Sequence, residues 1–123
     1  MNETRKCPSL RLRIVFGDAE MIGPGKVELL ERIDRCGSIA AAGREMGMSY
    51  KRAWQLVSLL NGMFNAPLVD STRGGRGVGG AVLTQTGRAV LDLYRGCEAD
   101  AAAAGAVHLS ALAKLRTDIP GGK

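Results

Sequence analysis

A mostly α-helical domain with one small β-hairpin is the fold that the sequence predicts, and three observations lead to it. Apolar residues recur at helical spacing through the middle and the C-terminal part of the 123-residue chain. Small polar residues that cap helices, and glycines that end them, separate these stretches. One glycine-rich loop lies between two short β-type stretches. The length suits a single domain, and 46% hydrophobic residues can fill its core.

The N-terminal part is predicted to form a strand followed by a helix. Residues 10–16 alternate between apolar and other side chains, which predicts a half-buried strand. Pro24 suits the first turn of a helix, and residues 26–36 carry apolar side chains on one face and charged side chains on the other. Gly37 is predicted to end this helix in a left-handed conformation.

Two helices joined by a short turn that contains Gly47 are predicted next. Ser38 is a good N-cap for an alanine-rich helix over residues 39–46, and Ser49 for a longer helix over residues 50–64. This pattern predicts a helix-turn-helix, in which the polar start of the second helix normally contacts the bases of DNA. A helical hairpin without any role in nucleic-acid binding would have the same pattern, so the turn alone leaves both interpretations open.

A glycine-rich loop follows the two helices. Residues 67–72 and 81–84 are predicted to pair as strands, and residues 73–80 between them include five glycines and two arginines. A helix-turn-helix followed by such a hairpin is a winged helix, and the loop can lie against phosphates or enter a minor groove. An exposed hairpin without a ligand is the alternative. The glycines also match the G-x-G-x-x-G fingerprint, but they lead into a strand instead of a helix, so nucleotide binding is rejected.

A long final helix is predicted from Thr84 or Thr86 to Ala104, and a short helix over residues 106–115 follows it. The apolar face of the long helix is broad and consists of Val90, Leu93, Tyr94, Cys97 and Ala101. Such a face either closes the core of the domain or lies against a second subunit. We expect it to serve dimerisation.

These elements predict the domain organisation. Residues 10–105 are expected to form the winged helix-turn-helix domain, which includes a C-terminal dimerisation helix over residues 85–104. Residues 1–9 are expected to form an N-terminal tail, and residues 106–123 a short helix and a second tail.

Most of the positive charge of the chain is concentrated in one third of it. Between Met46 and Arg88 lie five basic residues and one acidic residue, Asp70, so that this part carries +4 of the net charge of +5. Clustered cations beside polar donors are typical of proteins that bind polyanions. A solvated basic surface without a ligand would give the same count.

Other classes of function find little support in the composition. The three cysteines are far apart, and the single histidine, His108, has no partners at the spacing of a metal site or a catalytic triad. No apolar run is long enough to span a membrane, and the N-terminus is charged where a signal peptide would be apolar. We therefore expect a cytoplasmic protein that is not an enzyme and uses neither a metal nor a cofactor.

Two sequence segments carry a family resemblance. One is S-Y-K-x-A-W, which begins at Ser49, and the other is G-G-x-G-x-G-G-A-x-L-T at residues 74–84. With further matches from Gly37 to Tyr94, the sequence resembles the N-terminal DNA-binding domain of the ModE-type, molybdate-responsive transcriptional regulators. The helix-turn-helix is also similar, more distantly, to that of the LysR-type regulators.

The resemblance implies a homodimeric winged-helix regulator that binds double-stranded DNA at a pseudo-palindromic operator. It implies DNA contacts by Ser38, Ser49, Tyr50, Lys51, Arg52, Gln55, Arg73, Gly75, Arg76 and Gly77. It also implies that the first helix takes part in dimerisation, which adds Leu29 and Ile33 to the residues of the last helix. Trp54 is expected to pack beneath the recognition helix.

The family's longer members carry a molybdate-binding module after this domain, and we expect this chain to be a stand-alone domain that lacks it. We therefore do not expect the chain to bind or sense molybdate by itself. The alternative function is that of a protein-interaction module, which keeps the winged fold and heterodimerises with, or antagonises, a longer regulator.

Overall fold

A computed structural model describes residues 8–18, 20–71 and 80–116 of the chain. The elements of this part are β1 (Ile14–Val15), β2 (Met21–Ile22), α1 (Pro24–Cys36), α2 (Ile39–Glu45), α3 (Tyr50–Met63), β3 (Val69–Asp70), β4 (Val82–Leu83), α4 (Gln85–Ala104) and α5 (Ala106–Leu115). Strand β1 pairs with β2, and β3 with β4, both in antiparallel register. The mostly α-helical winged helix-turn-helix fold that the sequence predicts is confirmed.

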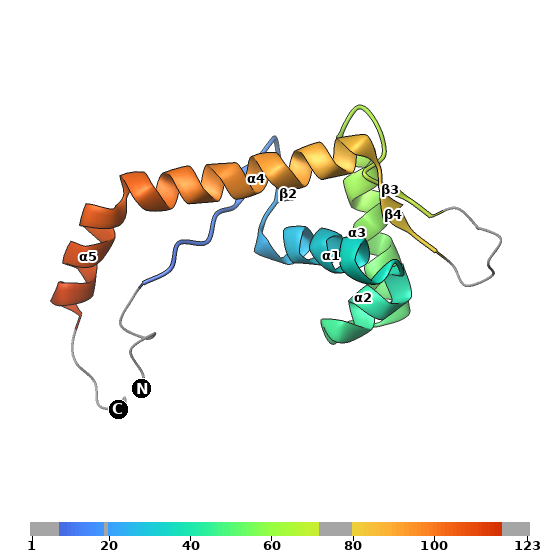
Figure 1. Cartoon of the computed structure of the whole chain (residues 1–123), viewed down its shortest axis with the longest axis horizontal. Helices are drawn as coiled ribbons and strands as arrows, with labels where there is room; N and C mark the ends of the chain where they lie inside the picture. The colour runs from blue at the N-terminus through green and yellow to red at the C-terminus, as the bar shows by residue number, and fades with distance from the viewer. Residues whose placement is uncertain (1–7, 19, 72–79, 117–123) are drawn as a thin grey trace.

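Helix α4 is the longest element, and it runs from the β3–β4 hairpin to α5. It lies across the body formed by α1, α2 and α3 and continues well past that body, where α5 turns away from its axis (Figure 1). The β3–β4 hairpin lies at the opposite end of α4 (Figure 1). Helix α5 contributes no buried residue to the core. None of the helices in the described part is both long and apolar enough to cross a membrane.

The core is aliphatic and is built around α1. Leu29, Leu30 and Ile33 have no exposed surface, and Leu60 of α3 and Leu68 ahead of β3 are equally buried beside them. Burial of each such side chain contributes about 1.5–3 kcal/mol to the stability of the fold. The amphipathic pattern of α1 thus determines which face of this helix turns inward.

Helix α4 is attached to the N-terminal segment as well as to the core. Tyr94 is buried, with 2% of its surface exposed, and its hydroxyl donates a hydrogen bond to the carbonyl oxygen of Leu12 at 2.6 Å. The N-terminal segment therefore packs along α4, a contact between residues that are far apart in the sequence.

The first strand is shorter than predicted. Leu12 and Ile14 are half-buried between exposed arginines, as the alternation indicates, but only Ile14–Val15 pairs with another strand. The partner, β2, lies between the predicted strand and the predicted helix, where no strand was predicted. A strand needs a paired neighbour, and among the described residues Met21 and Ile22 supply it where the chain folds back.

Candidate nucleic-acid interface

Helices α2 and α3 cross at a point where both present small residues. A methyl group added to Gly43 would lie 2.7 Å from the Cβ atom of Ala53, which is closer than two nonbonded carbon atoms normally approach. Gly47 occupies the turn between the helices with a φ of +76°, a conformation that glycine adopts without steric cost. The amide of Met48 donates to the carbonyl oxygen of Gly43 at 3.0 Å and closes the turn. The predicted helix-turn-helix is therefore present.

Serine side chains cap both of these helices, as the sequence predicts. The hydroxyl oxygen of Ser38 accepts from the amide of Ala41, and that of Ser49 accepts from the amide of Arg52, each at 3.0 Å. Ser49 is exposed and Ser38 is half-buried. Each hydroxyl keeps its own proton, which it can donate to a phosphate oxygen.

The start of α3 presents a cluster of exposed hydrogen-bond donors. Tyr50 is 62% exposed, and Lys51, Arg52 and Gln55 are also exposed. The N-terminus of a helix attracts anions because its first amides lack partners within the helix. The predicted contacts Ser49, Tyr50, Lys51, Arg52 and Gln55 therefore lie together on one accessible surface, which we call the α3 surface.

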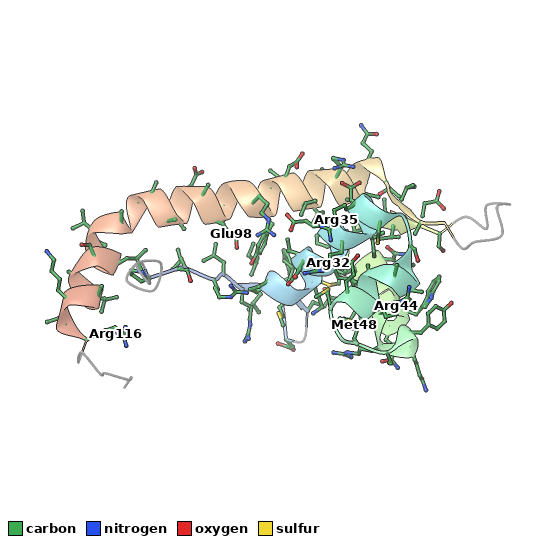
Figure 2. All side chains as sticks on the ribbon, turned by 60° about the horizontal axis from the view of Figure 1, so that its bottom comes forward. Arg32, Arg35, Arg44, Met48, Glu98 and Arg116 are labelled. Carbon is green, nitrogen blue, oxygen red and sulfur yellow. The ribbon has the colours of Figure 1, made fainter. Side chains whose placement is uncertain are left out.

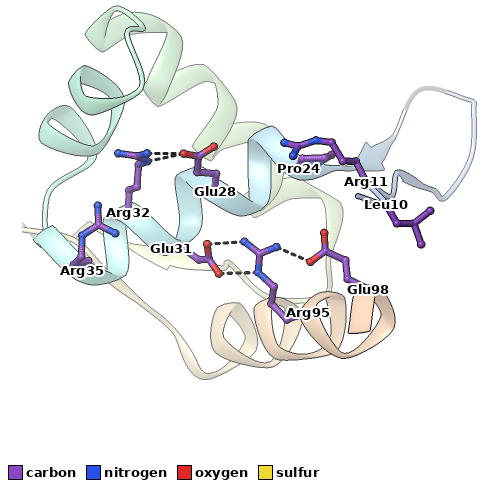
Figure 3. Close-up of a pocket in the computed structure, with 9 residues that line it drawn as sticks. All are labelled: Leu10, Arg11, Pro24, Glu28, Glu31, Arg32, Arg35, Arg95 and Glu98. Atoms are coloured by element: carbon purple, nitrogen blue, oxygen red, sulfur yellow. Dashed lines mark hydrogen bonds and ion pairs between the residues drawn. The ribbon is translucent and has the colours of Figure 1, made fainter. Parts of the chain in front are cut away.

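Ion pairing distinguishes the α3 surface from helices α1 and α4. In the described part of the chain, no ion pair includes Lys51 or Arg52, whereas the arginines of α1 and α4 all have carboxylate partners. In Figure 3, Arg95 lies between Glu31 and Glu98, and Glu28 lies beside Arg32. The hydrogen bond from Arg95 holds the pKa of Glu31 below its ordinary value. The cations of α3, unlike the arginines of α1 and α4, therefore keep their charge available to an anion.

The charge count taken from the sequence needs correction at two residues. Arg88 forms an ion pair with Asp34 of α1 at 2.6 Å, so its charge is not available at the interface. Arg44 lies just before Met46, where the charge count began. It is nevertheless exposed and, among the described residues, has no acidic partner. Figure 2 shows Arg44 close to the turn that holds Met48. A count that began at the start of α2 would have found it.

The predicted contacts in the glycine-rich loop, Arg73, Gly75, Arg76 and Gly77, lie outside the described residues. The base of the loop is described. Gly80 forms an isolated β-bridge with Ser38, and the amide of Ala81 donates to the carbonyl oxygen of Gly37 at 3.0 Å. The β4 side of the hairpin therefore lies directly beside the start of α2.

Trp54 packs where the sequence predicts it. It is half-buried against the core cluster, and its ring meets the Tyr50 ring edge to face with 6.1 Å between centroids. Its indole Nε1 is buried and has no hydrogen-bond partner among the described residues. Trp54 thus anchors the first turns of α3 beneath the exposed donors.

The residues predicted for dimerisation divide into two groups. Leu29 and Ile33 are fully buried and Tyr94 nearly so, all within this chain's own core, so their side chains have no surface to offer a second subunit. Periodicity identified an apolar face correctly at these positions, but α1 and α4 bury those faces against their own chain. Leu93 is 74% exposed, Cys97 is exposed, and Val90 and Ala101 are half-buried.

The crossed α2–α3 pair, the exposed cations at the start of α3 and the hairpin that follows define a DNA-binding domain of the winged helix-turn-helix class. Residues 25–88, just over half of the chain, match the bacterial regulatory helix-turn-helix proteins of the lysR family. The chain belongs to this family, whose members are regulators of transcription.

Individual relatives confirm the more specific resemblance to ModE. The chain is 43% identical over 91 residues to the molybdenum-pterin-binding protein MopA of Rhodobacter capsulatus, a match that covers 74% of the chain and 34% of the relative. It is 34% identical over 122 residues to the molybdenum transport protein ModE of Azotobacter vinelandii, covering 99% of the chain and 43% of the relative. It is 39% identical over 71 residues to the DNA-binding transcriptional dual regulator ModE of Escherichia coli (strain K12), covering 58% and 27%. The chain thus spans less than half the length of each of these relatives.

Proposed function

We propose that this chain is a sequence-specific regulator of transcription that binds a pseudo-palindromic operator as a homodimer and controls genes of molybdenum metabolism. The observation that carries the proposal is the α3 surface, where Lys51 and Arg52 are exposed beside a capped helix N-terminus and outside every ion pair of the described residues. In a winged helix this surface enters the major groove. The names of the relatives, which refer to molybdenum, support the choice of target genes.

Different side chains have different roles in this proposal. Lys51, Arg52 and Gln55 reach base edges, while Ser49, Arg44 and the loop arginines Arg73 and Arg76 contact phosphates. Phosphate contacts position a protein on DNA, and base contacts select the sequence. The chain has no catalytic role in this scheme and requires no cofactor.

The dimer is proposed to form through α4. A shallow hollow on this helix is lined by Leu93, Gly96, Cys97 and Ala101, with Asp92 and Asp100 at its sides. The small residues allow close approach of a second helix, and Leu93 supplies apolar surface. Two copies related by a two-fold axis would place their α3 helices in successive major grooves, about 34 Å apart.

A second candidate function is that of an interaction module for a longer regulator. The exposed apolar side chains of α5 favour it, since Val107 is 76% exposed and Leu112 is 60% exposed. Helix α5, which carries them, lies beyond the body that carries the α3 surface (Figure 1). Weak binding to any DNA, together with co-purification of a longer relative, would favour this function.

The decisive experiment is a titration of labelled DNA from directly upstream of the chain's own gene, in the presence of competitor DNA and with or without molybdate. We expect tight binding that does not depend on molybdate. Lys51→Ala and Arg52→Ala should each weaken it by about 1–3 kcal/mol, whereas Lys114→Ala, which removes the same charge from exposed α5, should not. Binding that requires molybdate, or equal effects of all three variants, would contradict the proposal.

A further inference from the structure

One large apolar side chain interrupts the polar, exposed side of α3. The inward face of the helix consists of Ala53, Leu56, Val57 and Leu60, all of which are buried. Leu59 lies outside this face and is 54% exposed. A single exposed leucine is common on protein surfaces, so its exposure alone implies no function. Its neighbours are more informative.

Leu59 is part of a shallow hollow on the α3 surface. The hollow is lined by Lys51, Arg52, Trp54, Gln55, Ser58 and Leu59. Lys51, Gln55 and Leu59 follow at intervals of four residues and therefore form one stripe, about 12 Å long, which is close to the width of the DNA major groove. A cation begins the stripe, an amide stands at its centre, and an apolar side chain ends it.

The chemistry of this stripe matches one base pair in particular. Glutamine can pair with both N6 and N7 of adenine, and the 5-methyl group of thymine is the apolar group that base pairs offer in the major groove. Lys51 and Arg52, which line the same hollow, can donate to the edges of neighbouring bases, as the proposed function assigns them. Resting on the proposed function, we propose that Gln55 and Leu59 select A·T pairs, with the thymine 5-methyl group held in the hollow between Leu59 and Trp54.

Replacement of thymine by deoxyuridine removes this methyl group and leaves all hydrogen-bonding groups in place, so it tests the proposal directly. The wild-type chain is first used to enrich duplexes from a randomised library. The affinity for the best duplex is then measured by fluorescence anisotropy, with each thymine replaced in turn. Loss of one buried methyl group should weaken binding about fourfold at the contacted thymine.

The protein variants provide the second arm of the test. Leu59→Ala should bind the thymine and deoxyuridine duplexes equally well, because the methyl group has lost its partner. Val15→Ala, which truncates a side chain of similar exposure (61%) on β1, should retain the fourfold ratio. Since the ratio compares two duplexes with one protein, it does not depend on how much of the variant is folded.

The outcomes separate this inference from the proposed function. If the chain enriches a specific duplex but no deoxyuridine replacement changes its affinity by as much as twofold, the methyl contact is wrong and DNA binding stands. If Leu59→Ala still binds the thymine duplex fourfold more tightly than the deoxyuridine duplex, the proposed contact is also wrong. If no duplex is enriched, the proposed function itself fails, and the inference fails with it.

Discussion

The guanidinium of Arg88 donates two hydrogen bonds to the carboxylate of Asp34, at 2.6 and 3.0 Å. Arg88 lies in the first turn of α4 and Asp34 in the last turn of α1, 54 residues earlier in the sequence. Arg95 and Glu31 form a second pair between the same two helices. These two ion pairs therefore link the long helix directly to α1.

Replacement of Ser49 separates the capping of α3 from its contact with DNA. Ser49→Ala removes the acceptor of the Arg52 amide and should lower the free energy of unfolding by about 1 kcal/mol. Ser49→Asp keeps a capping oxygen but adds a negative charge where we propose phosphates to lie, so it should fold like the wild type and bind DNA poorly. Urea denaturation and anisotropy titrations measure the two effects. Equal DNA affinity of Ser49→Asp and the wild type would contradict the assigned surface.

Replacement of Gly43 tests the close crossing of α2 and α3. Gly43→Ala would bring two methyl groups to 2.7 Å, so the helices must separate, at a cost of about 1–3 kcal/mol in the free energy of unfolding. Gly62→Ala is the matched control, because no atom lies within 4 Å of the added methyl group. It should be neutral or stabilise the chain by up to about 1 kcal/mol. A Gly43→Ala protein as stable as the control would show that the helices cross less closely.

Replacement of Leu93 tests the proposed dimer. Because Leu93 is 74% exposed, Leu93→Asp should leave the fold of the single chain intact. It should shift the mass in solution from twice 13.0 kDa to 13.0 kDa and weaken operator binding, since one subunit then holds only half of the site. Light scattering after size-exclusion chromatography gives the mass, and Val15→Asp is the control. An unchanged mass for Leu93→Asp would move the interface away from this part of α4.

The pair between Glu31 and Arg95 predicts a dependence of stability on pH. Arg95 lowers the pKa of Glu31 in the folded chain below the value of about 4.3 expected for an unfolded chain. The pair therefore stabilises the fold above that unfolded pKa, and its contribution disappears as the pH falls through the folded pKa. Glu31→Gln should lower the free energy of unfolding by at most about 1 kcal/mol at about pH 7, since the side chains are 37% and 41% exposed and water screens their charges.

The control for this pH dependence is Glu20→Gln, which changes an exposed glutamate outside the ion pairs of the described residues. The difference between wild type and Glu31→Gln should shrink as the pH falls below the unfolded value of about 4.3, while that for Glu20→Gln stays small throughout. A difference for Glu31→Gln that is constant with pH would mean that the charge of the carboxylate does not stabilise the fold.

Features determined by neighbouring residues were predictable from the sequence. The caps at Ser38 and Ser49 depend on amides three residues away, and the ends of α4 and α5 follow from similarly local signals. The exposed donors at the start of α3 were predictable for the same reason, because helical spacing separates Lys51 and Gln55 from the inward face.

Features that depend on distant residues were not predictable in this way. Periodicity marks Tyr94 as apolar, but only the folded chain shows that its own N-terminal segment covers it and accepts its hydrogen bond. Whether the charges of Arg44 and Arg88 are available to a ligand likewise depends on which carboxylates other helices bring near them. The sequence therefore predicted helix α3 and its exposed donors, whereas the buried side chains of Leu29, Ile33 and Tyr94 were predicted to lie between subunits.

The placement of Trp54 has a practical consequence for spectroscopy. It is the single tryptophan of the chain, and it packs directly beneath the exposed donors of α3. The intrinsic fluorescence of the protein excited at the red edge therefore originates from α3 alone. Emission from the unmodified chain can report on the occupancy of this helix without any attached dye.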